Sequence, residues 1–218
     1  LCKWLIRNIR GALYLISFNL AASFISMPLP PPSVAREPMH TRTITVQSFA
    51  REDGLWDLEA SLLDVKSYDF PIRNGQTHKA GDPVHLMHLR VTIDSSFEIV
   101  DAVAVYDAAP YQDNCSSISD AYRKLVGLNL LKQFRQGVKE RFGRSAGCTH
   151  MSELAQVLPT TAVQTMAGRR RSSGESEIYR TDKQPFHLDG CHALRLSGPV
   201  VEEFYPVWFR PKVTDGVE

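Results

Sequence analysis

The most distinctive chemistry in the chain belongs to three cysteines outside its first segment, Cys115, Cys148 and Cys191. Two histidines accompany them: His150 lies two residues after Cys148, and His192 directly follows Cys191. Thiolate and imidazole groups on loops form the usual ligand set of zinc and iron–sulfur sites. We therefore predict that these five residues bind a transition metal, either zinc or an iron–sulfur centre.

The spacing of the cysteines matches no short metal-binding motif, because the sequence contains no Cys-x-x-Cys pair. The fold must bring distant loops together to form such a site. Three alternatives stay open. The cysteines can pack in the core as small hydrophobic residues. Cys148 can be the nucleophile of an enzyme, with His150, His85 or His192 as its base. The chain can also be a non-catalytic module that binds a ligand or a partner.

His85 and His88 have the spacing of a metal-binding pair, but they lie in a region that alternates between apolar and polar residues. Such alternation predicts a β-strand over residues 86–93. Residues three apart on a strand point to opposite faces, so one ion cannot easily take both histidines. If the strand begins only at Leu86, His85 lies on a loop and can reach the cysteine site.

The elements that must position these residues divide into strands and then helices. Alternating patterns predict strands over residues 43–49, 55–68, 86–93 and 99–106. Apolar residues then recur at helical spacing over residues 118–138 and 151–166, the second stretch with a kink near Pro159. Cys115 and Cys148 would directly precede these two helices. A last apolar segment, 200–209, could close the sheet or cover the helices.

This order predicts an α+β fold, an antiparallel β meander followed by two long helices packed on one face. We expect a single domain over residues 43–210, with a mobile loop at 168–183. A proline-rich lead-in at 27–42 precedes the domain, and a tail at 211–218 follows it.

Residues 1–26 form a doubtful leader. Lys3, Arg7 and Arg10 precede an uncharged, mostly apolar stretch, the arrangement of a signal peptide or membrane anchor. The chain begins with leucine, however, and Met27 lies just downstream, so the segment can also be an upstream extension of the reading frame. We expect a cytoplasmic protein, or an exported or membrane-anchored one if the leader is genuine.

The balance of charged residues also bears on which classes of partner are expected. Lysine and arginine number 25 against 24 acidic residues, giving a net charge of +1. No strong overall field attracts nucleic acid, and we expect no nucleic-acid partner. The basic run Arg169 to Arg171 has no interleaved aromatic residues and is expected to be a solvated loop. The physiological partner stays unknown.

Five short motifs resemble those of a bacterial family catalogued only as a domain of unknown function. The motifs are RTI at 42–44, EDGLW at 52–56, PVHLM at 83–87, GCTH at 147–150 and DGCHA at 189–193. The resemblance covers about residues 27–210. It implies a common organisation and no particular reaction.

A second, looser similarity is to the iron–sulfur cluster assembly scaffolds, which also run an antiparallel meander into helices with cysteines at the junctions. By that resemblance Cys115 and Cys148 match scaffold ligands. The chain departs from the scaffolds in two respects. Residues 112–119 contain one cysteine where the scaffolds have a pair, and Cys191 lies in a tail that the scaffolds lack.

Overall fold

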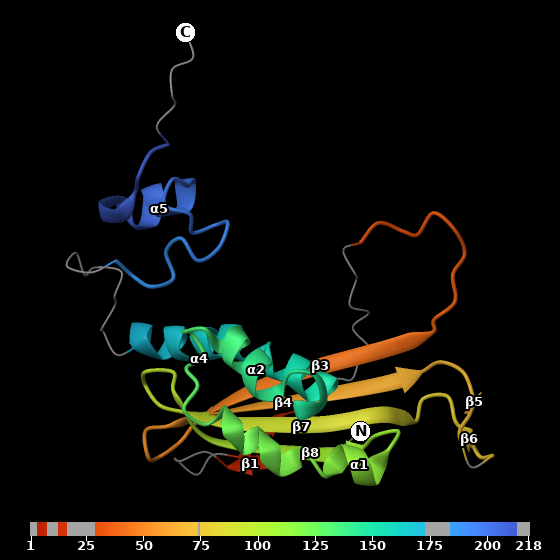
Figure 1. Ribbon diagram of the computed structural model, residues 1–218. Helices are drawn as coiled ribbons and strands as arrows, with labels where there is room; N and C mark the ends of the chain where they lie inside the picture. Colours follow the sequence, from red (N-terminus) through yellow and green to blue (C-terminus); the bar gives the residue numbers. More distant parts are fainter. Residues whose placement is uncertain (1–3, 8–12, 17–28, 74, 173–183, 213–218) are drawn as a thin grey trace. The chain divides into compact units, whose positions relative to one another are not determined.

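The computed structural model describes residues 4–7, 13–16, 29–73, 75–172 and 184–212 (Figure 1). The chain divides into two compact units, Leu1–Glu37 and Pro38–Glu218. The first unit contains a hairpin of β1 (Trp4–Arg7) and β2 (Leu13–Ile16). These strands lie within the segment predicted to be a leader, and the rest of residues 1–26 falls outside the described residues.

A four-stranded antiparallel sheet is the centre of the second unit. Its order is β3 (His40–Ala50), β4 (Trp56–Lys66), β7 (Pro83–Ile93) and β8 (Ile99–Ala108), so each strand pairs with the next long strand in the sequence. A separate small hairpin, β5 (Phe70–Pro71) with β6 (Thr77–His78), interrupts the connection from β4 to β7. The predicted antiparallel meander is confirmed.

One face of this sheet is apolar because every second residue of each inner strand is hydrophobic. Leu58 and Leu62 of β4 and Met87 and Val91 of β7 are at most 1% exposed. Removing such side chains from water is the main favourable contribution to folding, about 1.5–3 kcal/mol for each fully buried large one. The alternation in residues 86–93 therefore predicted the buried face correctly.

The turn from β3 to β4 shows how local sequence sets this topology. Gly54 has φ +84°, a left-handed conformation that glycine adopts without steric cost. The amide of Arg51 donates to the carbonyl of Leu55 across this turn at 2.9 Å. The Asp-Gly sequence predicted a turn at this point, and the two strands pair along their whole length.

The first predicted long helix, over residues 118–138, is wrong. The structure has α1 (Gln112–Ser116), a 3-10 helix at Ser119–Leu125, and α2 (Phe134–Phe142). Between the last two, Gly127 has φ +81° and its amide donates to the carbonyl of Ile99 at 2.8 Å. The backbone therefore pairs with the start of β8 instead of continuing a helix. The apolar spacing was nevertheless informative, since Tyr122, Leu125 and Val138 are buried.

The second predicted helix is two helices, α3 (Thr149–Ala155) and α4 (Leu158–Ser172). The break falls at residues 156–157, just before Pro159. Proline is tolerated in the first turn of a helix but not in its interior, so the chain restarts there. Helix α3 packs on β4 and β7, and α4 packs on β3 and β4 (Figure 1). The α+β class, with helices on the sheet, is confirmed.

The C-terminal segment forms α5 (Pro199–Phe204) and a 3-10 helix at Pro206–Trp208. Leu188, Val201 and Tyr205 form a small apolar cluster of their own there. Of the loop predicted at 168–183, residues 168–172 belong to α4, and residues 173–183 lie outside the described part of the chain. The end of the predicted tail, 213–218, also lies outside it. None of the described helices is long and apolar enough to cross a membrane.

Candidate metal centre

A row of polar side chains crosses three adjacent strands at one end of the apolar sheet face. Strand register places Arg42 of β3 opposite Asp64 of β4, and Asp64 opposite His85 of β7. The next row inward is apolar, with Leu62 and Met87 opposite each other and both buried. The polar row therefore forms the edge of the hydrophobic core and not part of the open surface.

Asp64 is the centre of this row, and its side chain is only 1% exposed. Its Oδ1 accepts from Arg42 Nε at 2.8 Å and lies 3.2 Å from His40 Nε2. Its Oδ2 accepts from Arg42 Nη2 at 2.7 Å and lies 3.0 Å from His85 Nδ1. A buried carboxylate is tolerated only with such partners, because removing an unpaired charge from water is very costly.

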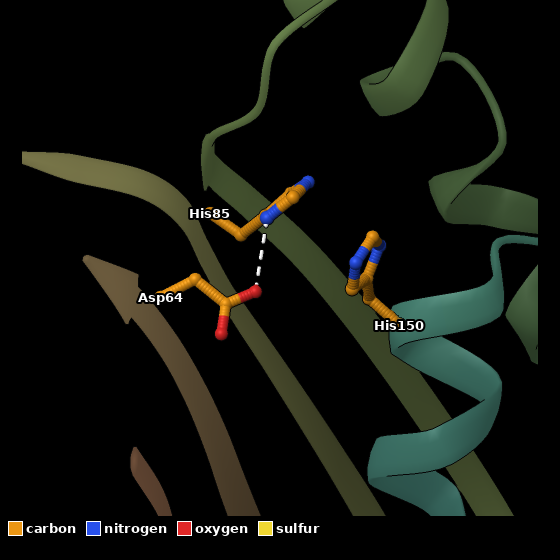
Figure 2. A group of neighbouring side chains, drawn as sticks. All are labelled: Asp64, His85 and His150. Atoms are coloured by element: carbon orange, nitrogen blue, oxygen red, sulfur yellow. Dashed lines mark hydrogen bonds and ion pairs between the residues drawn. The ribbon is translucent and has the colours of Figure 1, made fainter. Parts of the chain in front are cut away.

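His150 approaches the same row from the helical layer. It is the second residue of α3, and the packing of that helix on β4 and β7 places its ring beside that of His85. The two ring centroids are 3.9 Å apart at an interplanar angle of 33°. One ligand atom from each of Asp64, His85 and His150 lies within 4.8 Å of the other two (Figure 2).

The charge states of these groups follow from their surroundings. Burial opposes ionisation of Asp64, but the Arg42 guanidinium outweighs it and holds the pKa of the carboxyl below its ordinary value. Burial lowers the pKa of His85, and the neighbouring His150 lowers it further, against the pull of Asp64. Burial and Arg42 lower the pKa of His150. Near pH 7 the site therefore holds one carboxylate and two neutral imidazoles.

This combination suits a divalent transition metal. A neutral imidazole offers a nitrogen lone pair, and carboxylate oxygen completes a ligand set known for zinc. Two ligands at about 2.0–2.1 Å from a tetrahedral ion are about 3.3 Å apart, and His85 Nδ1 lies 3.0 Å from Asp64 Oδ2. Transfer of the His85 ring proton to Nε2 leaves Nδ1 free to coordinate. The three ligand atoms lie within 4.8 Å of one another, so side-chain movement must draw the group together before one ion can contact all three.

The structure differs from the sequence-based prediction in where it places the cysteine and histidine residues that were expected to bind a metal. Cys148 directly precedes α3, as expected, whereas Cys115 lies within the short α1 and not ahead of a long helix. Both are partly buried at the edge of the main core, and both line an open cavity together with His150. Cys191 and His192 lie in an exposed turn, where His192 Nε2 is 3.2 Å from Arg195 Nη1.

Within the described ranges, no metal-sized group of histidine, cysteine and acidic side chains contains a cysteine. The predicted cysteine cluster for zinc or an iron–sulfur centre is therefore not formed by these residues. His150 is the one predicted ligand that belongs to the group. The donors are oxygen and nitrogen because the end of the sheet supplies Asp64 and His85, and the first turn of α3 adds His150.

Sequence reasoning missed Asp64 and did not place His85 in the site. The signal for Asp64 was present, because the residue continues the inward-facing series Leu58, Ala60 and Leu62, where a charged residue is unexpected. The strand begins at Pro83 and not at Leu86, so His85 faces inward from the sheet itself. His88 pairs with Asp107 instead, which confirms that the two histidines point to opposite faces.

A match that the sequence reasoning also missed is Gly-x-Ser-x-Gly at residues 143–147, the spacing of a nucleophile elbow. In that elbow a strand leads into the serine and a helix follows. Here helix α2 precedes the segment, Ser145 lies in a 3-10 turn, and the left-handed residue is Arg144 at φ +56°. The structural context therefore does not support serine hydrolysis.

Comparison with known proteins gives one match. No curated protein and no solved structure matches the chain. A family model matches residues 40–164, which contain the whole four-stranded sheet, α1 to α3, the first part of α4, and all members of the Asp64, His85 and His150 group. The motif at residues 189–193 lies outside that match. The chain belongs to the family described as "Protein of unknown function (DUF2889)".

Proposed function

We propose that this protein binds a divalent transition-metal ion, of which zinc is the type, through Asp64, His85 and His150. The observation that carries the proposal is the convergence of one buried carboxylate and two neutral imidazoles within 4.8 Å. Nitrogen and oxygen donors of this kind favour zinc and its neighbours over calcium or magnesium, which prefer oxygen alone.

Arg42 makes the site stable without an ion and still permits one to bind. Its guanidinium compensates the charge of Asp64, and its Nη1 also donates to Glu153 Oε2 at 2.5 Å. When a dication takes over the compensation of Asp64, Arg42 keeps Glu153 as a partner. His40, close to the other oxygen of Asp64, helps to fix the carboxylate, and such outer partners tune metal affinity.

Calorimetric titration of the full chain with Zn²⁺ tests the proposal. We expect one ion per chain. His85→Ala and His150→Ala should each weaken binding more than about 100-fold, beyond the loss that outer partners usually cause. His88→Ala is the matched control, because His88 lies on the same strand and also contacts an aspartate at 3.0 Å.

A second control separates the proposal from the cysteine hypothesis. The Cys115→Ser, Cys148→Ser double variant should bind zinc as the unchanged chain does. The proposal is wrong if the unchanged chain binds no zinc, if His88→Ala weakens binding as much as His85→Ala does, or if the cysteine variant loses its affinity.

A further inference from the structure

An open cavity of about 640 Å³ adjoins the metal group. Its walls come from α1, from the turn at residues 143–148 and from the first turn of α3. A volume of this size lies within the range of about 300–1,000 Å³ typical of small-molecule sites. The cavity is therefore large enough for a compact ligand.

The lining of the cavity mixes polar and apolar groups and carries little charge. Asn114, Ser117, Ser145 and Thr149 offer amide and hydroxyl groups, and Cys115 and Cys148 add two thiols. Among the described residues, no acidic side chain, lysine or arginine lines it. The lining itself therefore offers a ligand no charged side chain to pair with, which favours an uncharged molecule.

His150 connects the cavity to the metal group, because it lines the first and belongs to the second. Two further side chains contact the group from the side of β3. Asp64 is buried in the sheet, and Arg42 and His40 contact its oxygens from β3. A zinc ion with three protein ligands keeps a fourth position for water or substrate. A ligand in the cavity would reach that position alongside His150.

We infer that this cavity binds a small uncharged molecule that coordinates the ion at Asp64, His85 and His150 through a carbonyl or hydroxyl oxygen. The inference rests on the proposed metal site and adds the chemical class of its ligand. It makes the metal an open centre that takes a substrate or ligand, in contrast to a closed structural site.

The test uses the full chain loaded with Co²⁺, whose visible absorption reports on its ligands, and acetamide as an uncharged carbonyl-oxygen probe. The probe should change the cobalt spectrum to saturation. Ser145→Trp, which fills the cavity from its exposed rim, should weaken probe binding at least about 10-fold and leave cobalt affinity unchanged. Ser95→Trp, in the turn after β7, is the control and should behave as the unchanged chain does.

Cavity occupancy has a second, independent measure. Cys115 and Cys148 line the cavity, so the probe should slow their alkylation by iodoacetamide while that of Cys191 stays constant. Equal probe affinity in Ser145→Trp and the unchanged chain, or an unchanged cobalt spectrum, would overturn this inference alone. Failure of cobalt to bind at all would overturn the proposed metal site together with it.

Discussion

Strand β7 carries two histidine–aspartate pairs that look alike by distance. His85 Nδ1 lies 3.0 Å from Asp64 Oδ2, and His88 Nε2 lies 3.0 Å from Asp107 Oδ2. The first pair faces the helices, with side chains 15% and 1% exposed, and the second lies on the other face, with side chains 42% and 53% exposed. Among the described residues, only the first pair is joined by a second imidazole and a guanidinium.

The comparison shows that contact distance alone does not distinguish a pair within a buried polar network from an exposed pair. An exposed pair is solvated whether or not it forms, and is worth about 0–1 kcal/mol. A buried carboxylate needs compensating partners, so its neighbours are determined by the fold. Burial and the number of converging donors distinguish the Asp64 group from the Asp107 pair.

The largest expected difference between the Asp64 and Asp107 pairs is in the stability that each aspartate provides. Asp64→Ala removes the acceptor of a buried network and leaves Arg42 with Glu153 alone, so we expect a loss of about 3 kcal/mol in the free energy of unfolding. Asp107→Ala should change that free energy by less than about 0.5 kcal/mol. Urea unfolding measures both. Equal losses would contradict the distinction between the two pairs.

A smaller loss of stability is expected when Arg42, the positive charge that compensates Asp64, is removed. Arg42→Gln leaves Asp64 buried without its main partner, and protonation of nearby histidines compensates in part, so we expect a loss of about 2 kcal/mol. Zn²⁺ should then stabilise this variant more than it stabilises the unchanged chain, because the ion replaces the missing positive charge. If Zn²⁺ raises the free energy of unfolding of Arg42→Gln no more than that of the unchanged chain, the ion does not replace the charge of Arg42.

The pH dependence of stability gives the smallest difference. The pKa values of His85 and His150 are lower in the folded chain than the ordinary value near 6.5. The unfolded chain therefore binds more protons as pH falls through 6.5, and stability decreases in that direction. Asp64, with its lowered pKa, adds a further loss below about pH 4. Above both of these pH ranges, the three groups should make their full contribution to the free energy of unfolding.

Histidine variants assign this slope to the buried site. His85→Gln and His150→Gln should each flatten the decline in unfolding free energy between pH 7 and pH 5. Urea titrations at several pH values give the comparison. A decline that neither variant flattens, or a stability that increases toward acid in the unchanged chain, would be inconsistent with neutral buried imidazoles.

The sequence was sufficient where a local pattern decides the structure. Alternation over residues 86–93 predicted the buried side chains of β7, since strand periodicity needs no distant partner. The prediction of one helix over residues 118–138 was wrong because short helices and a 3-10 turn place apolar residues at similar intervals. The length of a helix depends on where the backbone finds other partners, as Gly127 does with Ile99.

The site was harder to predict because it depends on register. His150 and His85 were both considered as ligands, but nothing local states that Asp64 lies opposite His85, or that α3 places His150 over the pair. The cysteines were favoured for their chemistry alone. Residue type indicates which metals a side chain can bind, and the strand pairing decides which side chains meet.

Zinc K-edge X-ray absorption of the full chain with one equivalent of Zn²⁺ tests the central claim most directly. Asp64, His85 and His150 predict a nitrogen and oxygen shell at about 2.0–2.1 Å, with the outer-shell scattering of imidazole and no sulfur. A shell at about 2.3 Å would show cysteine ligation. That result, or a spectrum of zinc bound only by water, would contradict the account.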